Sequence, residues 1–205
     1  DTVADAGGER KTVSSIEVPM LPNHERLSAK RVAPVVAKFA GTYDVPEPLV
    51  LAVIKNESSF NPRAQSPEPA FGLMQLVPST GGRDAYRFVR GENKAPSPDH
   101  LFKPNANMRL GTAYLHLLMK RYLAPIENRT SRLYCAIAAY NTGAGNLART
   151  FTDGTSVEAA ARRINRMRPQ AVYRHLVQNL PYEETRTYLK RVESDRREFQ
   201  GWDRS

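Results

Sequence analysis

The feature that most constrains this chain is a helical segment whose apolar face ends in a carboxyl group. The sequence predicts a helix over residues 46–56, because two prolines suit its first turn. Val50, Val53 and Ile54 then follow at i, i+3 and i+4 and mark one apolar face. Glu57 stands at i+7 from Val50, so it lies on the same face at the C-terminal end of the helix.

Two effects act against a negative charge on Glu57. An apolar site disfavours the ionised carboxylate, and so does the negative end of the helix dipole. A carboxyl group that stays protonated near neutral pH can act as a general acid. The alternative is structural, with Glu57 turned outward into solvent or paired with Arg63.

The residues that follow predict a turn that comes back toward this end of the helix. Ser66 is far enough along the chain for a fold-back that brings a hydroxyl group near the carboxyl group. Gly72 permits a close backbone approach. Leu73 and Met74 then supply apolar side chains and Gln75 supplies an amide, a mixture that suits a sugar with an N-acetyl group. The same four residues are also compatible with an ordinary buried turn.

A second predicted helix repeats this geometry with a tyrosine. Leu133, Ala136 and Ile137 stand at apolar helix spacing, and Tyr140 follows at i+7 with its polar tip at the helix end. Plain core packing is the structural alternative for such a tyrosine. Asn141 and two nearby glycines follow, and these glycines let the backbone approach a ligand or the Glu57 helix closely.

Helices are predicted over almost the whole chain, which gives an all-α fold. Tyr188 shares a helix face with Val192 and is expected to point inward, with a core tyrosine as the alternative. Either Thr130 or Ser131 is expected to cap the helix that ends at Tyr140. The other predicted helices cover residues 28–43, 78–88, 104–122, 144–151, 157–167, 169–178 and 182–199. Residues 1–23 are expected to be mostly irregular, with a weak strand signal over 15–21.

Composition limits the class of protein and its partners. A chain of 205 residues with 40% hydrophobic and 25% charged residues suits one soluble globular domain. No apolar run is long enough to span a membrane, and no signal peptide is visible. The net charge of +9 favours an anionic partner. Nucleic acid is not expected, because no DNA- or RNA-binding motif accompanies the charge.

The metal-binding and redox residues point to no cofactor. Cys135 is the only cysteine, so no internal disulfide is expected, and it is predicted to be a small core residue. The four histidines are scattered without metal-ligand spacing, so no metal is expected. Only one carboxyl group, that of Glu57, is a good candidate for acid–base chemistry.

Four motifs together resemble one enzyme family, the Slt-type (family 1) lytic transglycosylases. The first two are Glu57-Ser58-Ser59-Phe60-Asn61-Pro62-Arg63-Ala64-Gln65-Ser66 and Gly72-Leu73-Met74-Gln75. The third is Ala139-Tyr140-Asn141 with its glycines, and a looser fourth is Glu184-Thr185-Arg186-Thr187-Tyr188-Leu189. The resemblance covers roughly residues 28–198 and is strongest to a membrane-bound branch of the family. Pro69 departs from the pattern, which affects the expected shape of the turn rather than the chemistry.

The resemblance implies a lysozyme-like fold of the goose-type/Slt catalytic domain, a helical globule with a glycan-binding cleft. Residues 28–205 would form the catalytic domain, and residues 1–27 a linker or the tail of a preceding domain. Such an enzyme cleaves the bond between N-acetylmuramic acid and N-acetylglucosamine in peptidoglycan, with formation of a 1,6-anhydro sugar. The implied catalytic residues are Glu57, Ser66 and Tyr140, and the implied substrate-binding residues are Met74, Gln75, Asn141 and Tyr188.

The expected partner is the glycan strand of peptidoglycan, with no cofactor and with a monomer favoured. The resemblance implies the bacterial cell envelope and the periplasm, with membrane attachment through a segment outside this chain, as in an outer-membrane lipoprotein. Two other functions remain open. One is a goose-type lysozyme that hydrolyses the same bond with water, and the other is a non-catalytic module that binds peptidoglycan or nucleic acid.

Overall fold

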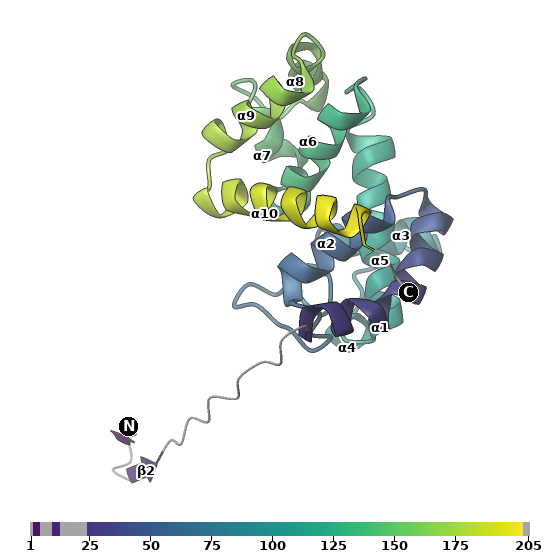
Figure 1. Cartoon of the computed structure of the whole chain (residues 1–205), viewed down its shortest axis with the longest axis vertical. Helices are drawn as coiled ribbons and strands as arrows, with labels where there is room; N and C mark the ends of the chain where they lie inside the picture. Colours follow the sequence, from purple (N-terminus) through teal and green to yellow (C-terminus); the bar gives the residue numbers. More distant parts are fainter. Residues whose placement is uncertain (1, 5–9, 13–23, 203–205) are drawn as a thin grey trace.

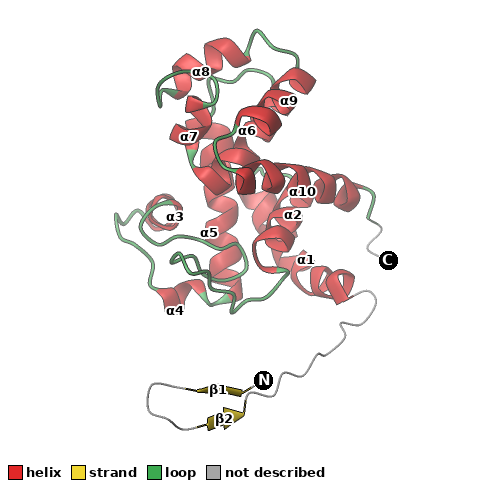
Figure 2. Ribbon diagram, turned by 90° about the vertical axis from the view of Figure 1, so that its left-hand side faces the viewer, coloured by secondary structure: helices red, strands yellow, loops and turns green. Residues whose placement is uncertain are grey.

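The computed structural model of the chain describes residues 2–4, 10–12 and 24–202 (Figures 1 and 2). Within the longest of these ranges the chain is helical. The helices are α1 (His24–Tyr43), α2 (Glu47–Ser58), α3 (Gly81–Arg90), α4 (Pro98–Leu101), α5 (Pro104–Leu117), η1 (Leu118–Tyr122), α6 (Arg129–Thr142), α7 (Ala144–Arg149), α8 (Val157–Ile164), α9 (Pro169–Asn179) and α10 (Glu183–Gln200). The all-α prediction is therefore confirmed for the body of the molecule.

The first described residues form a short two-stranded ribbon. Strands β1 (Thr2–Ala4) and β2 (Arg10–Thr12) pair antiparallel, with Val3 opposite Lys11. The prediction of irregular structure misses this ribbon, because three-residue strands carry too little alternation to detect. The strand signal over residues 15–21 lies outside the described residues.

Helix α2 forms the centre of the fold and is buried on all sides. Its residues from Leu49 to Ile54 are each at most 1% exposed. The sequence pattern predicts one apolar face for this helix, but the structure buries more than that face. Leu51 and Ala52, which lie off the predicted face, are buried as deeply as Val50. The long helix α10 packs across α2, and α1 covers a further side. Figure 1 shows α10 across the middle, with α6–α9 above it and α1, α3 and α4 below.

A second, smaller core lies under the long loop between α2 and α3. Phe71 and Leu76 in the loop pack with Leu101, Leu110 and other buried residues of α3–α5. Backbone bridges pair Phe71 with Gln65 on one side and with Leu76 on the other. This packing fixes the turn of residues 72–75, called here the 72–75 turn, beside α5.

Most helix boundaries fall within a few residues of the prediction, and the differences have local causes. Helix α1 begins at His24 instead of residue 28. The helix predicted over 104–122 changes at Leu118 into the π-helix η1, which ends with an N–H of Leu123 bonded to the Leu118 carbonyl. The predicted cap of α6 is wrong: Asn128 is the N-cap, and its side chain accepts hydrogen bonds from the N–H groups of Thr130 and Ser131. Cys135 is fully buried, as predicted.

Candidate active site

The candidate site begins where α2 ends. Glu57 is the penultimate residue of α2, and the next two residues after the helix, Ser59 and Phe60, have φ angles of 48° and 64°. Two successive left-handed residues without glycine are strained, and such strain is common at functional sites. Phe60 is only 7% exposed, so its burial helps to hold this reversal. The chain therefore turns away sharply just after Glu57.

Glu57 has the electrostatic environment that its helix face predicts. Part of the side chain reaches solvent, yet enough protein surrounds it for burial to raise its pKa from 4.5 to about 7. An interaction with the Tyr188 hydroxyl lowers the pKa of Glu57, and the charge of Glu184 raises it again. No ion pair joins Glu57 to Arg63 within the described residues, and the burial that raises its pKa speaks against a side chain turned fully into solvent. Glu57 is therefore a carboxyl group poised to exchange a proton near neutral pH.

Tyr188 comes to Glu57 from α10, although it is distant in the sequence. It is 8% exposed, and its hydroxyl makes no hydrogen bond of ordinary geometry within the described residues. It nevertheless lies close enough to Glu57 for each group to alter the pKa of the other. Burial, followed by the charge of Glu57, raises the pKa of Tyr188 well above its ordinary value. Tyr188 is thus a neutral hydroxyl group beside the candidate acid.

Tyr140 lies beside the same carboxyl group but bonds elsewhere. Burial and the charge of Glu57 raise its pKa well above the ordinary value, so it also stays neutral. Its hydroxyl donates a 2.8 Å hydrogen bond to the backbone carbonyl of Met74. Tyr140 therefore connects α6 to the 72–75 turn, and does not itself bond to Glu57.

Asn107 holds the 72–75 turn from the other side, a role that sequence reasoning missed. It has no exposed surface, and its side-chain oxygen accepts a 2.8 Å bond from the N–H of Met74. Its amide nitrogen donates to the carbonyls of Phe71 and Leu101 at 2.7 and 2.9 Å. A buried polar side chain with every partner in place fixes a backbone well. An asparagine in a predicted helix carries no pattern that distinguishes this role from surface exposure.

Ser58 is a second neighbour of this turn that was not among the predicted site residues. It follows Glu57, and its hydroxyl contacts the carbonyls of Ile54 at 3.1 Å and Leu73 at 2.8 Å. Ser58 thereby joins the end of α2 directly to the 72–75 turn.

Two of the predicted site residues lie differently from expectation. The Ser66 hydroxyl bonds to the carbonyl of Glu68 within its own loop, and no described hydrogen bond joins it to Glu57. The side chain of Met74 has no exposed surface, so it does not line an open cleft. It fills the space over Gly111, where an added Cβ would approach the Met74 sulfur to 2.3 Å. The prediction that the Met74 side chain lines the cleft is therefore wrong, because that side chain is packed inside the core. Only the backbone of Met74 takes part in the contacts of the turn.

Gln75 and Asn141 flank an open pocket, and each has one polar atom already bonded. The Gln75 amide nitrogen donates to the carbonyls of Ala64 and Gly72, both at 2.9 Å. The Asn141 oxygen accepts a 2.6 Å bond from buried Thr185 of α10. With Tyr140, these residues line a pocket of about 250 Å³. Larger cavities lie elsewhere on the molecule, and Glu57 lines neither this pocket nor those cavities.

Within the part of the chain that the structure describes, no His, Cys, Asp and Glu side chains gather in groups of three or more that could hold a metal ion. None of the helices in residues 24–202 is long and apolar enough to cross a membrane.

Comparison with known proteins gives close relatives. The chain is 42% identical over 187 residues to membrane-bound lytic murein transglycosylase C of Histophilus somni, covering 91% of this chain and 51% of that protein. It is 41% identical over 189 residues to the protein of the same name from Actinobacillus succinogenes, with 92% and 52% coverage. The chain thus spans about half the length of the curated relatives it matches.

Solved structures agree on the fold. The 70 kDa soluble lytic transglycosylase Slt70 of Escherichia coli is 28% identical with a TM-score of 0.60, over 82% of this chain and 24% of that one. A complex of the 70 kDa soluble lytic transglycosylase with bulgecin A gives 27% identity and a TM-score of 0.62, over 85% of this chain and 26% of that one. Residues 34–162 match the family described as "Transglycosylase SLT domain". The chain therefore belongs to the Transglycosylase SLT domain family, with the lysozyme-like helical fold that the motifs predict.

Proposed function

We propose that this chain is the catalytic part of a peptidoglycan lytic transglycosylase. It would cleave the β-1,4 bond between N-acetylmuramic acid and N-acetylglucosamine without consuming water. The observation that carries the proposal is Glu57, with a pKa raised to about 7 beside two neutral tyrosines. The names of the relatives support the same activity.

The proposed reaction uses one protein carboxyl group twice. Protonated Glu57 donates its proton to the glycosidic oxygen as the bond from that oxygen to C1 breaks. The acetamido oxygen of the muramic acid stabilises the positive charge at C1, as an oxazolinium-like species. Glu57, now a carboxylate, removes the proton from the C6 hydroxyl of the same sugar. The C6 oxygen attacks C1, the acetamido group is released, and Glu57 is protonated again.

The neighbouring groups would have distinct roles in this reaction. The Tyr188 hydroxyl is buried without an ordinary partner, which suits donation to the Glu57 carboxylate or to the acetamido group. Tyr140 would act by positioning, since its bond to Met74 fixes the turn. Gln75 and Asn141 would bind sugar from the pocket that they line. Ser66 would contribute only if its bond to Glu68 is exchanged for one to the substrate.

A hydrolytic outcome is the second candidate, and one observation favours it. Glu184 lies close enough to Glu57 to raise its pKa, so a second carboxylate stands near the candidate acid. A goose-type lysozyme reaction would place a water molecule where the transglycosylase uses the C6 hydroxyl. Glu184 is exposed, which gives it less control over such a water than a buried base would have.

Location and domain limits follow as part of the same proposal. An enzyme of this kind works in the bacterial cell envelope, and the names of the relatives include the word membrane-bound. We propose the periplasm as its compartment, with attachment through a segment outside this chain. Residues 28–205 would form the catalytic domain together with the first turn of α1, because both α1 and α10 pack on α2.

Mass spectrometry of the products tests the proposal. The chain is incubated with purified sacculi, and the soluble fragments are weighed. Fragments that end in anhydro-muramic acid, one water lighter than reducing ends, are expected. Fragments that end in reducing sugars would show that the chain hydrolyses the bond with water and is not a transglycosylase. Glu57→Gln should lower the rate by about 10²–10⁴-fold, whereas Glu68→Gln, in the exposed loop, should not. No products from folded protein would leave a binding module as the function.

A further inference from the structure

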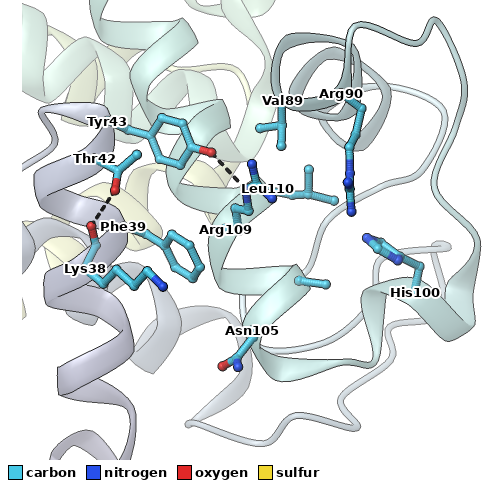
Figure 3. A pocket seen from close by; sticks show the side chains of 11 residues that line it. Lys38, Phe39, Thr42, Tyr43, Val89, Arg90, His100, Asn105, Arg109 and Leu110 are labelled. Atoms are coloured by element: carbon cyan, nitrogen blue, oxygen red, sulfur yellow. Dashed lines mark hydrogen bonds between the residues drawn. The ribbon is translucent and has the colours of Figure 1, made fainter.

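A second cavity lies between α1, α3, α4 and α5 (Figure 3). It has a volume of about 460 Å³ and is lined by none of the candidate site residues. Lys38 and Phe39 come to it from α1, Arg90 from the end of α3, His100 from α4 and Arg109 from α5. Three consecutive helices, α3, α4 and α5, therefore meet the distant α1 around one hollow.

The charges around this cavity are all of one sign. Lys38, Arg90 and Arg109 line it, and no Asp or Glu does. None of these three forms an ion pair within the described residues. Arg109 is half-buried, and its Nε donates to the Tyr43 hydroxyl at 3.2 Å. That bond holds the guanidinium in place and leaves its terminal N–H groups for an anion.

His100 supports a positive potential in the same place. Burial lowers its pKa, and the charges of Lys103 and Arg90 lower it further. Figure 3 shows the guanidinium of Arg90 pointing toward the His100 ring. Since both charges that act on the His100 ring are positive, the cavity is short of negative charge.

The rest of the wall favours an anion that carries an aliphatic part. Phe39, Val89 and Leu110 give the cavity apolar surface, and Thr42 and Asn105 add polar groups. Guanidinium groups bind planar carboxylates with two parallel bonds. A concave site with an aromatic side suits a short peptide with free carboxylates better than a flat lipid surface.

The cavity and the 72–75 turn use different sides of α5. Asn107 and Gly111 face the turn, through hydrogen bonds and through the packing of Met74. Arg109 and Ala106 face the cavity. At 100° per residue these two pairs lie on nearly opposite sides of the helix. A ligand in the cavity would therefore leave the candidate active site free.

We propose that this cavity binds the free carboxylates of a peptidoglycan stem peptide. The inference rests on the proposed function, because that function brings the chain to peptidoglycan. It adds a second contact with the cell wall, which recognises the peptide while the site at Glu57 acts on the glycan. The enzyme would then stay attached to a neighbouring peptide during successive cleavages.

A titration with a defined peptide tests the site. The probe is the stem tripeptide of L-alanine, γ-linked D-glutamate and diaminopimelate, added to the intact chain and followed by NMR. Signals of Arg109 and His100 should shift, and the pKa of His100 should rise as a bound carboxylate favours its charged form. Arg90→Gln with Arg109→Gln should weaken binding at least tenfold. The control is Arg83→Gln, which removes an exposed charge on the same helix as Arg90 but outside the cavity. This change should leave binding unaltered.

The controls separate this site from the proposed activity. If the double variant is unstable, the exposed Lys38→Gln replaces it and should weaken binding severalfold. A tripeptide with amidated carboxylates should not bind. Equal binding of the amidated peptide, or unchanged binding by the variants, overturns the proposal. Binding to anionic lipid vesicles that depends on Arg90 and Arg109, without peptide binding, overturns it in favour of a membrane contact.

Cleavage of peptide-free glycan strands is measured separately. The cavity variants should cleave such strands at the normal rate. Normal cleavage without tripeptide binding refutes only the peptide site, whereas tripeptide binding without any cleavage refutes only the proposed activity.

Discussion

The hydroxyl of Tyr140 donates a 2.8 Å hydrogen bond to the backbone carbonyl of Met74. The bond joins the end of α6 to the turn that follows the Glu57 helix in sequence. Because the charge of Glu57 also raises the pKa of Tyr140, the tyrosine lies next to both the turn and the candidate acid. It is thus placed to fix their relative position.

Tyr140→Phe tests this link. The change leaves the Met74 carbonyl without its donor, which is expected to lower the free energy of unfolding by about 1–3 kcal/mol. The rate of sacculus cleavage should fall as well, because the turn beside Glu57 loosens. Denaturant unfolding and product release measure the two effects. Tyr182→Phe, at a tyrosine that is 56% exposed, is the control. Equal stability of the two variants would contradict the link.

The raised pKa of Glu57 predicts the pH dependence of activity. Its folded pKa is about 7 and its ordinary value is 4.5. A general acid works only while protonated, so kcat/KM should fall as the pH rises through about 7. Initial rates with soluble glycan strands between pH 5 and 9 measure the falling limb. If kcat/KM instead begins to fall near pH 4.5, Glu57 does not act as a general acid with a raised pKa.

The same pKa predicts how Glu57→Gln changes stability. The unfolded chain ionises Glu57 above about pH 4.5 while the folded chain still holds the proton, so the native carboxyl destabilises the fold increasingly up to about pH 7. Glu57→Gln should therefore raise the free energy of unfolding at pH 8, by about 3 kcal/mol at most. The gain should vanish near pH 4. A loss of stability at pH 8 would contradict the cause assigned to the shift.

Asn107→Ala should loosen the 72–75 turn. The change leaves the N–H of Met74 and the carbonyl of Leu101 without their partner, while the Phe71 carbonyl loses one of its two hydrogen bonds. We expect a loss of about 3 kcal/mol or more in the free energy of unfolding. Asn105→Ala, an exposed asparagine on the same helix, should change it by less than about 0.5 kcal/mol. Matched denaturation curves decide, and similar losses for both would refute the role of Asn107.

Two glycine substitutions should have opposite signs. At Gly111 an added Cβ would meet the Met74 sulfur at 2.3 Å, so Gly111→Ala should destabilise the chain by about 1–3 kcal/mol. At Gly41, in α1, nothing lies within 4 Å, and Gly41→Ala should stabilise it by about 0.5–1 kcal/mol. Thermal melts of the two variants compare the signs, and a gain at Gly111 would show that the core is loosely packed there.

Asp195 on α10 should matter for the position of Tyr188. Its carboxylate accepts a 2.9 Å bond from Lys55 and a 2.7 Å bond from Asn56, which clamps α10 to the end of α2. Asp195→Ala should therefore lower both stability and cleavage, with a larger effect on kcat than on KM. Asp44→Asn, in the exposed pair with Lys120, should leave both unchanged. Unfolding and cleavage assays on both variants test the difference. Normal cleavage by Asp195→Ala would show that the clamp is not needed.

Much of the fold followed from local patterns. The apolar spacing in α2 and α6, and the prolines at helix starts, located most helices to within a few residues. The same spacing placed Glu57 and Tyr140 at helix ends on buried faces, where their pKa values are raised. The cap of α6, the π-helix η1 and the ribbon β1–β2 were missed, because each depends on a few local hydrogen bonds that leave no periodic signal.

The chain's order of residues determined which side chains stand on apolar faces and where helices end, since both depend on neighbours within a turn or two. Only the tertiary structure decided what those side chains meet. It placed Tyr188 beside Glu57, gave Asn107 three bonds to a distant turn, and buried Met74 over Gly111. It also gathered Lys38, Arg90 and Arg109 around one cavity. Such contacts join residues far apart in the chain, and their formation depends on how whole helices pack rather than on any local preference.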